Sequence, residues 1–299
     1  MKVWYRYGGI LLLLCALVLG GCGGIREAAK PADMTVLRVG AIPAEDSEKI
    51  REAYQPLVNH LSKKLGMKVE LFVATDYSGV IEAMRAGKLD IALFGPFSYV
   101  LAVEKANAEA FAVEKRRVGG TTYKSIIITH PESGINSLQD LKGRSFAFVD
   151  PASTSGNLFP RYFLKKNNID PDKDFKNLIY SGNHTAVELA VKNRKVDAGA
   201  DSSRTYSNLK SQGAISDQDV KIIYESDPIP ASPWAWRKDL PEHLKSQIRS
   251  AILNLAQEEP QAMNKSDPTI EGYAEAKDSD YDVVRETTKI LNLDLNKMK

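Results

Sequence analysis

The sequence has little cysteine and little net charge. Its 299 residues contain two cysteines, Cys15 and Cys22, so everything after Cys22 must fold without a disulfide. The formal net charge is +2, and Lys2 and Arg6, which no acidic residue accompanies in the first 21 positions, account for it. A nucleic-acid-binding protein is disfavoured because such binding needs a basic surplus. The 43% hydrophobic content excludes a disordered chain, and the length suffices for two domains.

Long apolar runs are also lacking, with one short exception at the start. Residues 1–21 place Lys2 and Arg6 before an apolar core at 10–19, which is too short to span a bilayer and is typical of a secretory signal peptide. Residues 22–35, rich in small and charged residues with one proline, predict a flexible tether. We therefore expect the remaining chain to be soluble outside the cytoplasm.

The end of the apolar run carries a second signal. Leu19-Gly20-Gly21-Cys22 resembles the bacterial lipobox, in which cleavage precedes a lipid-modified cysteine. The resemblance implies lipidation at Cys22 and a periplasmic or otherwise extracytoplasmic protein anchored to a membrane. The alternative is a secreted protein that happens to have a cysteine near its cleavage site.

From Val36 onward, short β-branched runs alternate with longer amphipathic ones, which predicts an α/β protein with a mainly parallel sheet. The expected strands lie at 36–42, 68–74, 90–94, 124–129, 144–149, 178–180, 196–200 and 220–225. The expected helices lie at 46–65, 78–86, from 95, 137–141, 154–167, 185–194, 241–257 and 282–291. We expect two lobes, 36–122 with 229–299 and 123–228, with the proline-rich stretch 227–233 as a crossover between them.

The most informative loop is 150–156, which follows a predicted strand and precedes a predicted helix. It contains three consecutive hydroxyl residues, Ser153, Thr154 and Ser155, followed by Gly156. Hydroxyls at a helix start stand beside free backbone N–H groups and the positive end of the helix dipole, which suits an oxyanion. Simple helix capping is the alternative, although it needs only one of these side chains. We expect Gly156 to let the backbone approach a ligand.

Other polar residues occupy equivalent places in the chain. Tyr77 lies in the strand-to-helix turn 75–79, Tyr99 follows the turn at 94–96, and His184 lies in the turn 181–185. Asp201 directly follows the strand predicted at 196–200. Ligands of open α/β sheets bind beyond the carboxyl ends of the strands, so these residues are expected around one cleft. The alternative for the two tyrosines is simple packing in the core. The alternative for His184 is a capping or packed side chain.

An enzyme is the second class to weigh, because Ser153 or Ser155 with His184 and Asp201 contains the elements of a nucleophilic triad. The sequence around these serines has no Gly-x-Ser-x-Gly elbow, and no histidines and acids have metal-ligand spacing. We therefore predict no enzymatic activity, no metal and no cofactor. The basic run 115–117 predicts an exposed charged turn, with a docking surface for a partner as the alternative.

Taken together, these motifs resemble the phosphonate, phosphite and phosphate binding proteins of ABC importers. The resemblance implies a type II periplasmic-binding-protein fold, in which two α/β lobes close on a ligand, and an ABC permease as partner. It implies that Ser153, Thr154 and Ser155 bind phosphorus oxygens. It further places Tyr77, His184, Asp201 and, less directly, Tyr99 around the ligand, with Asp201 accepting a protonated oxygen. A monomer is expected.

Two departures from the family bear on specificity. Members that take aminoalkyl phosphonates resemble each other in two carboxylates that hold the amine, and those places hold Arg204 and Ser232 here. Aminoethylphosphonate is therefore disfavoured. We expect a small phosphorus oxyanion, with phosphite first, methylphosphonate second and phosphate third. A lipoprotein that senses the same ligand for a membrane receptor would have the same binding domain and stays open as an alternative.

Overall fold

The computed structural model describes residues 34–266 and 269–298. The predicted signal peptide at 1–21, the lipidation site Cys22 and all but the last two residues of the tether at 22–35 lie outside the described residues. The chain divides into a short unit, Met1–Met34, and a large one, Thr35–Lys299, to which everything below refers. No helix in the described part of the chain is long and apolar enough to cross a membrane.

The first lobe is built on a six-stranded mixed sheet with the order β13-β4-β12-β3-β1-β2. Its strands are β1 Val36–Ala41, β2 Lys68–Val73, β3 Ile91–Leu93, β4 Ala108–Arg116, β12 Pro233–Arg237 and β13 Ile270–Glu275. β1 pairs in parallel with β2 and β3, whereas β12 pairs antiparallel with β3 and β4. The helices of this lobe are α1 Ser47–Leu65, α2 Tyr77–Arg85, α3 Pro96–Ala106, α8 Glu242–Leu253, α9 Leu255–Glu258 and α10 Pro260–Ser266.

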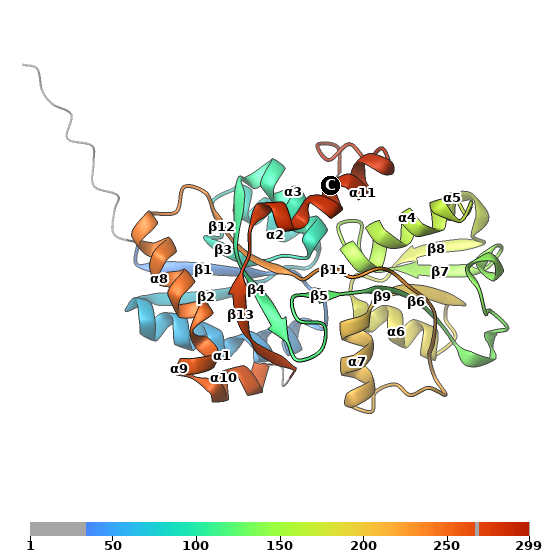
Figure 1. The fold of residues 1–299 in the computed structure, drawn as a ribbon, viewed down its shortest axis with the longest axis horizontal. Helices are drawn as coiled ribbons and strands as arrows, with labels where there is room; N and C mark the ends of the chain where they lie inside the picture. The colour runs from blue at the N-terminus through green and yellow to red at the C-terminus, as the bar shows by residue number, and fades with distance from the viewer. Residues whose placement is uncertain (1–33, 267–268, 299) are drawn as a thin grey trace, which may run out of the picture. The chain divides into compact units, whose positions relative to one another are not determined.

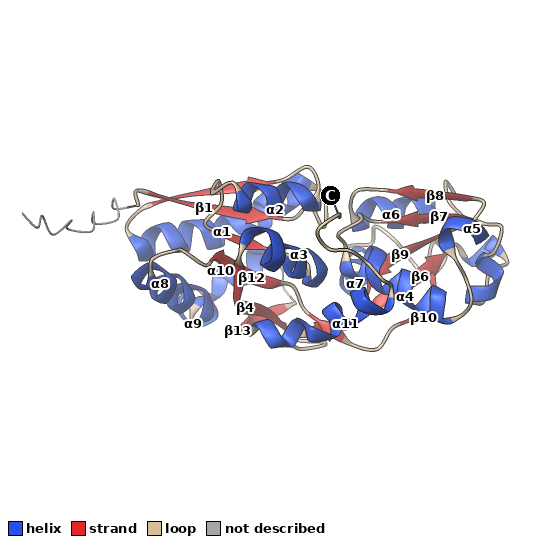
Figure 2. Ribbon diagram, turned by 90° about the horizontal axis from the view of Figure 1, so that it is seen from above, coloured by secondary structure: helices blue, strands red, loops and turns tan. Residues whose placement is uncertain are grey.

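The second lobe is built on a five-stranded sheet with the order β10-β6-β9-β7-β8. Its strands are β6 Ser125–Thr129, β7 Ser145–Phe148, β8 Asn177–Tyr180, β9 Ala198–Ser202 and β10 Lys221–Glu225. Its helical segments are η1 Pro131–Ser133, η2 Leu138–Leu141, η3 Thr154–Leu158, α4 Phe159–Lys166, α5 Pro171–Asp174, α6 His184–Lys192 and α7 Ser203–Ser211. β7 pairs in parallel with β8 and β9, and helices flank the strands of both sheets (Figure 2). The α/β architecture expected from the sequence is confirmed, but the expectation of a mainly parallel sheet is wrong: β4, β12 and β13 of the first sheet and β6 and β10 of the second pair antiparallel.

The two lobes are joined by a short antiparallel ribbon. β5 Thr122–Tyr123 pairs with β11 Ile229–Pro230, and the two strands run between the sheets (Figure 1). The chain enters the second sheet after β5 and leaves it before β11. The connection between the two sheets at this point is therefore made of extended backbone.

The end of the chain touches both lobes. After β13 come η4 Asp278–Tyr281 and α11 Asp282–Ile290, and α11 contacts α3 in the first lobe and η3 and α4 in the second. Lys105 of α3 donates to the carbonyl of Met298, and Lys165 of α4 donates to the carbonyl of Ile290 at 3.4 Å. The sequence predicted packing against the first lobe, and the structure adds the contact with the second.

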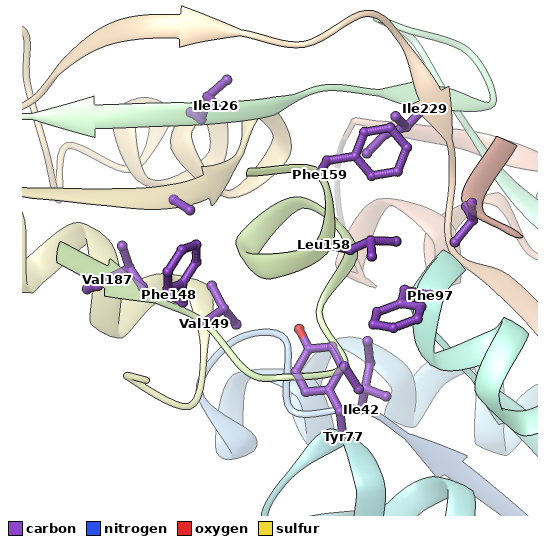
Figure 3. Close-up of a cluster of buried hydrophobic side chains, with 14 of the residues drawn as sticks. Ile42, Tyr77, Phe97, Ile126, Phe148, Val149, Leu158, Phe159, Val187 and Ile229 are labelled. Carbon is purple, nitrogen blue, oxygen red and sulfur yellow. The ribbon is translucent and has the colours of Figure 1, made fainter. Parts of the chain in front are cut away.

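A single cluster of buried apolar side chains runs through both lobes. Figure 3 shows Ile42, Tyr77 and Phe97 of the first lobe on one side of this cluster and Val149 and Leu158 of the second on the other. Apolar contact between the lobes stabilises the arrangement in which they meet. The two lobes are therefore in direct apolar contact in this structure.

Candidate functional site

A cavity of about 470 Å³ lies between the lobes and takes its lining from both. We call it the interlobe cavity. The residues that matter for its chemistry are Tyr54, Tyr77, Glu114 and Arg116 of the first lobe, Tyr123 of the ribbon, and Ser153, Thr154, Ser155, His184 and Arg204 of the second lobe. Its volume is in the range of about 300–1,000 Å³ typical of small-molecule sites.

One end of the cavity is formed by Ser153, Thr154 and Ser155, which with the hydroxyls of Tyr77 and Tyr123 we call the hydroxyl cradle. The three residues are 1–2% exposed. Ser153 caps η3 by accepting from the N–H of Gly156 at 3.1 Å, and Thr154 Oγ1 accepts from the N–H of Phe97 at 2.8 Å. A hydroxyl that accepts one hydrogen bond still has one O–H group that it can donate. The cradle is thus arranged to donate to an anion.

The helix that begins at the cradle differs from the sequence prediction in detail. The expected helix 154–167 is one π-helical turn, η3, followed by α4. A Cβ at Gly156 would lie 2.3 Å from Val149 Cγ2 and 2.9 Å from Ser153 Oγ. Glycine is therefore required by the close packing of η3 against the end of β7, and Gly156 is not among the residues that line the interlobe cavity.

Two tyrosines complete the cradle. Tyr77 begins α2 behind the capping residue Asp76, whose Oδ1 accepts from the N–H of Gly79 at 2.7 Å. Burial raises the pKa of Tyr77 well above its ordinary value of 10, and a hydrogen bond with Ser153 opposes this shift. Burial likewise raises the pKa of Tyr123, against hydrogen bonds with Ser155 and Thr154. Both phenols are therefore neutral donors next to the three hydroxyls, and Tyr123 was not found from the sequence.

His184 is oriented by a buried carboxylate. It begins α6 behind Asn183, whose Oδ1 accepts from the N–H of Ala186 at 2.8 Å, and its ring Nδ1 is hydrogen-bonded to Asp201 Oδ1. Asp201 lies on β9, fully buried behind the ring, while His184 itself lines the cavity. The bond to Nδ1 fixes the ring so that Nε2 is the nitrogen left to act on a ligand.

A third group, which the sequence did not indicate, stands behind this pair. Glu188 lies one turn after His184 on α6 and is fully buried. Burial raises its pKa to about 11, with the charge of Asp201 as the second cause, so Glu188 is protonated at neutral pH. Burial also raises the pKa of Asp201 to about 7 and lowers that of His184 to about 4.

Hydrogen bonds cross from one lobe to the other around the cradle. Besides Phe97 to Thr154, the N–H of His184 donates to the carbonyl of Ala44 at 3.0 Å. The N–H of Tyr77 reaches Asp150 Oδ2 at 3.4 Å. These contacts connect the two lobes around the cradle.

The other end of the interlobe cavity carries the charged side chains of Glu114, Arg116 and Arg204. Together with the neutral Tyr54 beside them, we call these residues the charged end. Glu114 Oε1 accepts from the Tyr54 hydroxyl at 2.9 Å, and its Oε2 accepts from Arg116 Nη2 at 3.0 Å. Arg204 stacks on the Tyr123 ring, 4.9 Å from Cζ to the centroid. The predicted turn at 115–117 is wrong for Arg116, which ends β4 with a side chain only 12% exposed.

The remaining predicted residues are placed as follows. Arg204 and Ser232, which stand where aminoalkyl-phosphonate binders are expected to have carboxylates, both line the interlobe cavity. Tyr99 does not line the interlobe cavity. Its hydroxyl donates to Asp278 Oδ1 at 2.7 Å and accepts from the N–H of Ala110 at 3.1 Å. The residue lines a second cavity together with Trp236 and Arg249. Within residues 34–266 and 269–298, no group of three histidine, cysteine or acidic side chains is placed to hold a metal ion.

Two α/β lobes that close a polar cavity between them, connected by a short ribbon, define the class of two-lobed periplasmic binding proteins. Residues 39–281 match the family described as the periplasmic substrate-binding protein of phosphonate ABC transporters. The chain belongs to this family, whose members are substrate-binding components of importers and not enzymes. Members of the family work outside the cytoplasm.

Individual relatives are also phosphonate- or phosphate-binding proteins by name. The chain is 37% identical over 223 residues to the phosphonates-binding periplasmic protein of Escherichia coli, covering 73% of this chain and 65% of that protein. It is 32% identical to the phosphate-import protein PhnD of Mycolicibacterium smegmatis, covering 90% and 91%. The structure of PhnD1 from Prochlorococcus marinus in complex with methylphosphonate matches with a TM-score of 0.79 at 25% identity, covering 86% and 98%.

Proposed function

We propose that this protein captures a small phosphorus oxyanion in the interlobe cavity and delivers it to the permease of an ABC importer. The observation that carries the proposal is the hydroxyl cradle, in which buried O–H donors converge without a carboxylate among them. Preorganised neutral donors stabilise an oxyanion strongly in a site from which water is excluded. Relatives named for phosphonates and phosphate support the same class of ligand.

Each residue of the cradle has a distinct role in this proposal. Ser153, Thr154 and Ser155 donate their hydroxyl protons to phosphorus oxygens, assisted by the backbone N–H groups of the first turn of η3. Tyr77 and Tyr123 donate from the opposite side. His184 bonds the anion through Nε2, and Asp201 with Glu188 positions the ring from behind. Tyr99 has no part in the site.

Among the smallest phosphorus oxyanions, we propose phosphite first, methylphosphonate second and phosphate third. A cradle that satisfies three oxygens leaves the fourth oxygen of phosphate without a partner, and an unpaired buried polar group costs about 1–3 kcal/mol. The P–H of phosphite and the methyl group of methylphosphonate need no partner. The methylphosphonate complex of the Prochlorococcus marinus relative supports a site of this size and chemistry.

Binding by lobe closure follows from where the cradle lies. Its hydroxyls come from both lobes and the ribbon, so the ligand adds bonds that only the closed arrangement can make. We propose that residues 36–122 with 229–299 and residues 123–228 move as two bodies about β5 and β11. We further propose that Cys22 carries a lipid anchor that keeps this monomeric protein near its permease.

Calorimetric titration tests the proposal directly. Residues 25–299, which contain the compact unit Thr35–Lys299 and lack Cys22, are titrated with phosphite, methylphosphonate, phosphate, aminoethylphosphonate and sulfate. Tight binding of one or two phosphorus anions without turnover is the expected result. Absence of binding across all five would mean that Ser153–Ser155 only caps a helix.

A further inference from the structure

Arg204 lines the interlobe cavity, and two of its N–H groups have no acceptor in the described chain. Its Nε and Nη2 are buried and have no partner among the described residues, and the whole side chain is 14% exposed. Its Nη1 lies 3.6 Å from Glu114 Oε2, beyond hydrogen-bond distance. Leaving buried donors of a charged group unsatisfied is costly, so an acceptor from outside the chain is expected here.

The charges around Arg204 do not supply that acceptor. Glu114 is the carboxylate nearby, and both of its oxygens are occupied, one by Tyr54 and the other by Arg116. Glu114 Oε2 is thus already engaged by Arg116 and lies beyond hydrogen-bond distance of Arg204 Nη1. Burial and the neighbouring Arg116 lower the pKa of Arg204, with Glu114 opposing, the direction expected for a cation that lacks a full counter-charge.

The remaining acidic residues that line the cavity lie elsewhere. Glu52 is exposed on α1, and Glu45 is half-buried in the loop before it, where its charge acts on His184 and Asp201. Among the described residues, the charged groups that act on Arg204 are Arg116 and Glu114. Neither gives Arg204 Nε or Nη2 an acceptor.

Tyr123 relates this site to the cradle. Its hydroxyl is hydrogen-bonded with Ser155 and Thr154, and its ring carries the Arg204 guanidinium on its face. A ligand whose phosphonate lies in the cradle can thus extend along this tyrosine toward Arg204. The cavity, at about 470 Å³, has room for such a substituent.

We propose that Arg204 binds a carboxylate at the far end of a substituted phosphonate, so that the preferred substituted ligands are carboxyalkylphosphonates. Nε–H and Nη2–H lie on one edge of the guanidinium, and this edge matches the two oxygens of a carboxylate in a bidentate pair. An ammonium substituent would be repelled by the same group. The inference rests on the proposed function, because it assumes that the cradle holds the phosphonate.

The test compares ligands of matched length on the wild-type protein. 3-Phosphonopropionate, propylphosphonate, 2-aminoethylphosphonate and methylphosphonate are titrated calorimetrically at one pH and salt concentration. We expect 3-phosphonopropionate to bind at least about tenfold more tightly than propylphosphonate, and 2-aminoethylphosphonate to bind most weakly. Equal affinity for the carboxyl and alkyl compounds would overturn the proposal while leaving the proposed function intact.

Two variants assign the effect to Arg204. Arg204→Met should abolish the advantage of 3-phosphonopropionate over propylphosphonate, and Arg204→Lys should retain part of it, with the advantage taken as the ratio of the two affinities on the same variant. Arg161→Met is the matched control, because Arg161 is also mostly buried in the second lobe and stacked on a ring, that of Phe148, but does not line the cavity. It should leave all affinities unchanged.

The outcomes separate the two proposals. If Arg204→Met weakens all four ligands equally, Arg204 contacts the phosphonate itself and the carboxylate site is overturned. If no phosphorus ligand binds the wild-type protein, the proposed function fails and this inference fails with it. Should the Arg204 variants not fold, the comparison between 3-phosphonopropionate and propylphosphonate on the wild-type protein still decides.

Discussion

The two ends of the interlobe cavity hold anions with different chemistry. The hydroxyl cradle uses neutral donors whose acceptor positions are already occupied, as at Ser153 and Thr154. The charged end places Arg116 and Arg204 beside the carboxylate of Glu114. A neutral cradle bonds the group that all phosphorus oxyanions share, whereas a guanidinium responds to the charge of a substituent. On this account the cradle determines the affinity for all phosphorus oxyanions, and the charged end determines which substituent is preferred.

The two ends also differ in how the chain builds them. Three of the five cradle hydroxyls are consecutive in the sequence and are positioned by one helix start. The charged end is assembled from α1, β4 and α7, which lie far apart in the chain. A single substitution in the cradle should therefore affect all ligands, while a substitution at the charged end should affect only some of them.

The largest effect on binding is expected from Ser155→Ala. Removing a hydroxyl that donates to an anion costs about 1.5–3 kcal/mol, so every phosphorus oxyanion should bind roughly ten- to a hundredfold more weakly. Calorimetric titration measures this. Ser207→Ala, on the exposed surface of α7, is the control. Intact affinities in Ser155→Ala would contradict the assignment of the cradle.

Next in size is Gly156→Ala, which acts on stability. The new Cβ would overlap Val149 Cγ2, 2.3 Å away, and such overpacking costs about 1–3 kcal/mol. Denaturant unfolding should show this loss. The double variant with Val149→Ala, which removes the clashing methyl groups, should recover part of it. If Gly156→Ala alone were as stable as wild type, the packing of η3 against β7 would be wrong.

Glu188→Gln tests the buried group behind His184. The folded protein keeps the Glu188 proton up to about pH 11, whereas the unfolded chain releases it near the ordinary pKa of 4.5. Stability due to this proton is complete below that value and is lost as the pH rises. Between about pH 7.5 and 9, the free energy of unfolding of wild type should fall relative to Glu188→Gln by up to about 1.4 kcal/mol per pH unit.

The other two groups of this cluster titrate below that range. Asp201, whose pKa is raised to about 7, contributes with the same sign as Glu188, and His184, whose pKa is lowered to about 4, contributes with the opposite sign. The interval from about pH 7.5 to 9 therefore isolates Glu188. Parallel pH profiles for the two proteins would show that Glu188 is ionised in the folded state.

The smallest change is expected from Tyr99→Phe, paired with Tyr77→Phe. Tyr77→Phe removes a cradle donor and should weaken all phosphorus ligands about tenfold. Tyr99→Phe removes the bonds to Asp278 and Ala110, so it should lower stability by about 1 kcal/mol and leave the affinities unchanged. A loss of affinity in Tyr99→Phe would show that Tyr99 contributes to ligand binding, which contradicts its assignment outside the site.

Local patterns allowed much of this to be predicted from the sequence. The alternation of strands and helices set the fold class, and the strand-to-helix turns marked Tyr77, Ser153–Ser155 and His184, all of which line the interlobe cavity. These features depend on residues adjacent in the chain, such as the caps Asp76 and Asn183. Local sequence is sufficient to describe such turns.

Features that depend on distant contacts were not predictable in this way. Glu114 and Arg116 share one face of β4, a strand whose charged residues resemble a surface turn in the sequence. Tyr99 has the sequence context of a site residue, but its partner Asp278 is 179 positions away. The carboxyl of Asp201 lies behind His184 because β9 packs under α6, which no local pattern reveals.

A crystal structure of residues 25–299 with phosphite would test the central claim most directly. The account predicts a phosphite ion in the interlobe cavity, with its oxygens within hydrogen-bond distance of Ser153, Thr154 and Ser155 and of His184 Nε2. Phosphite bound elsewhere, for example in the second cavity beside Trp236 and Arg249, with the cradle occupied only by water, would contradict it.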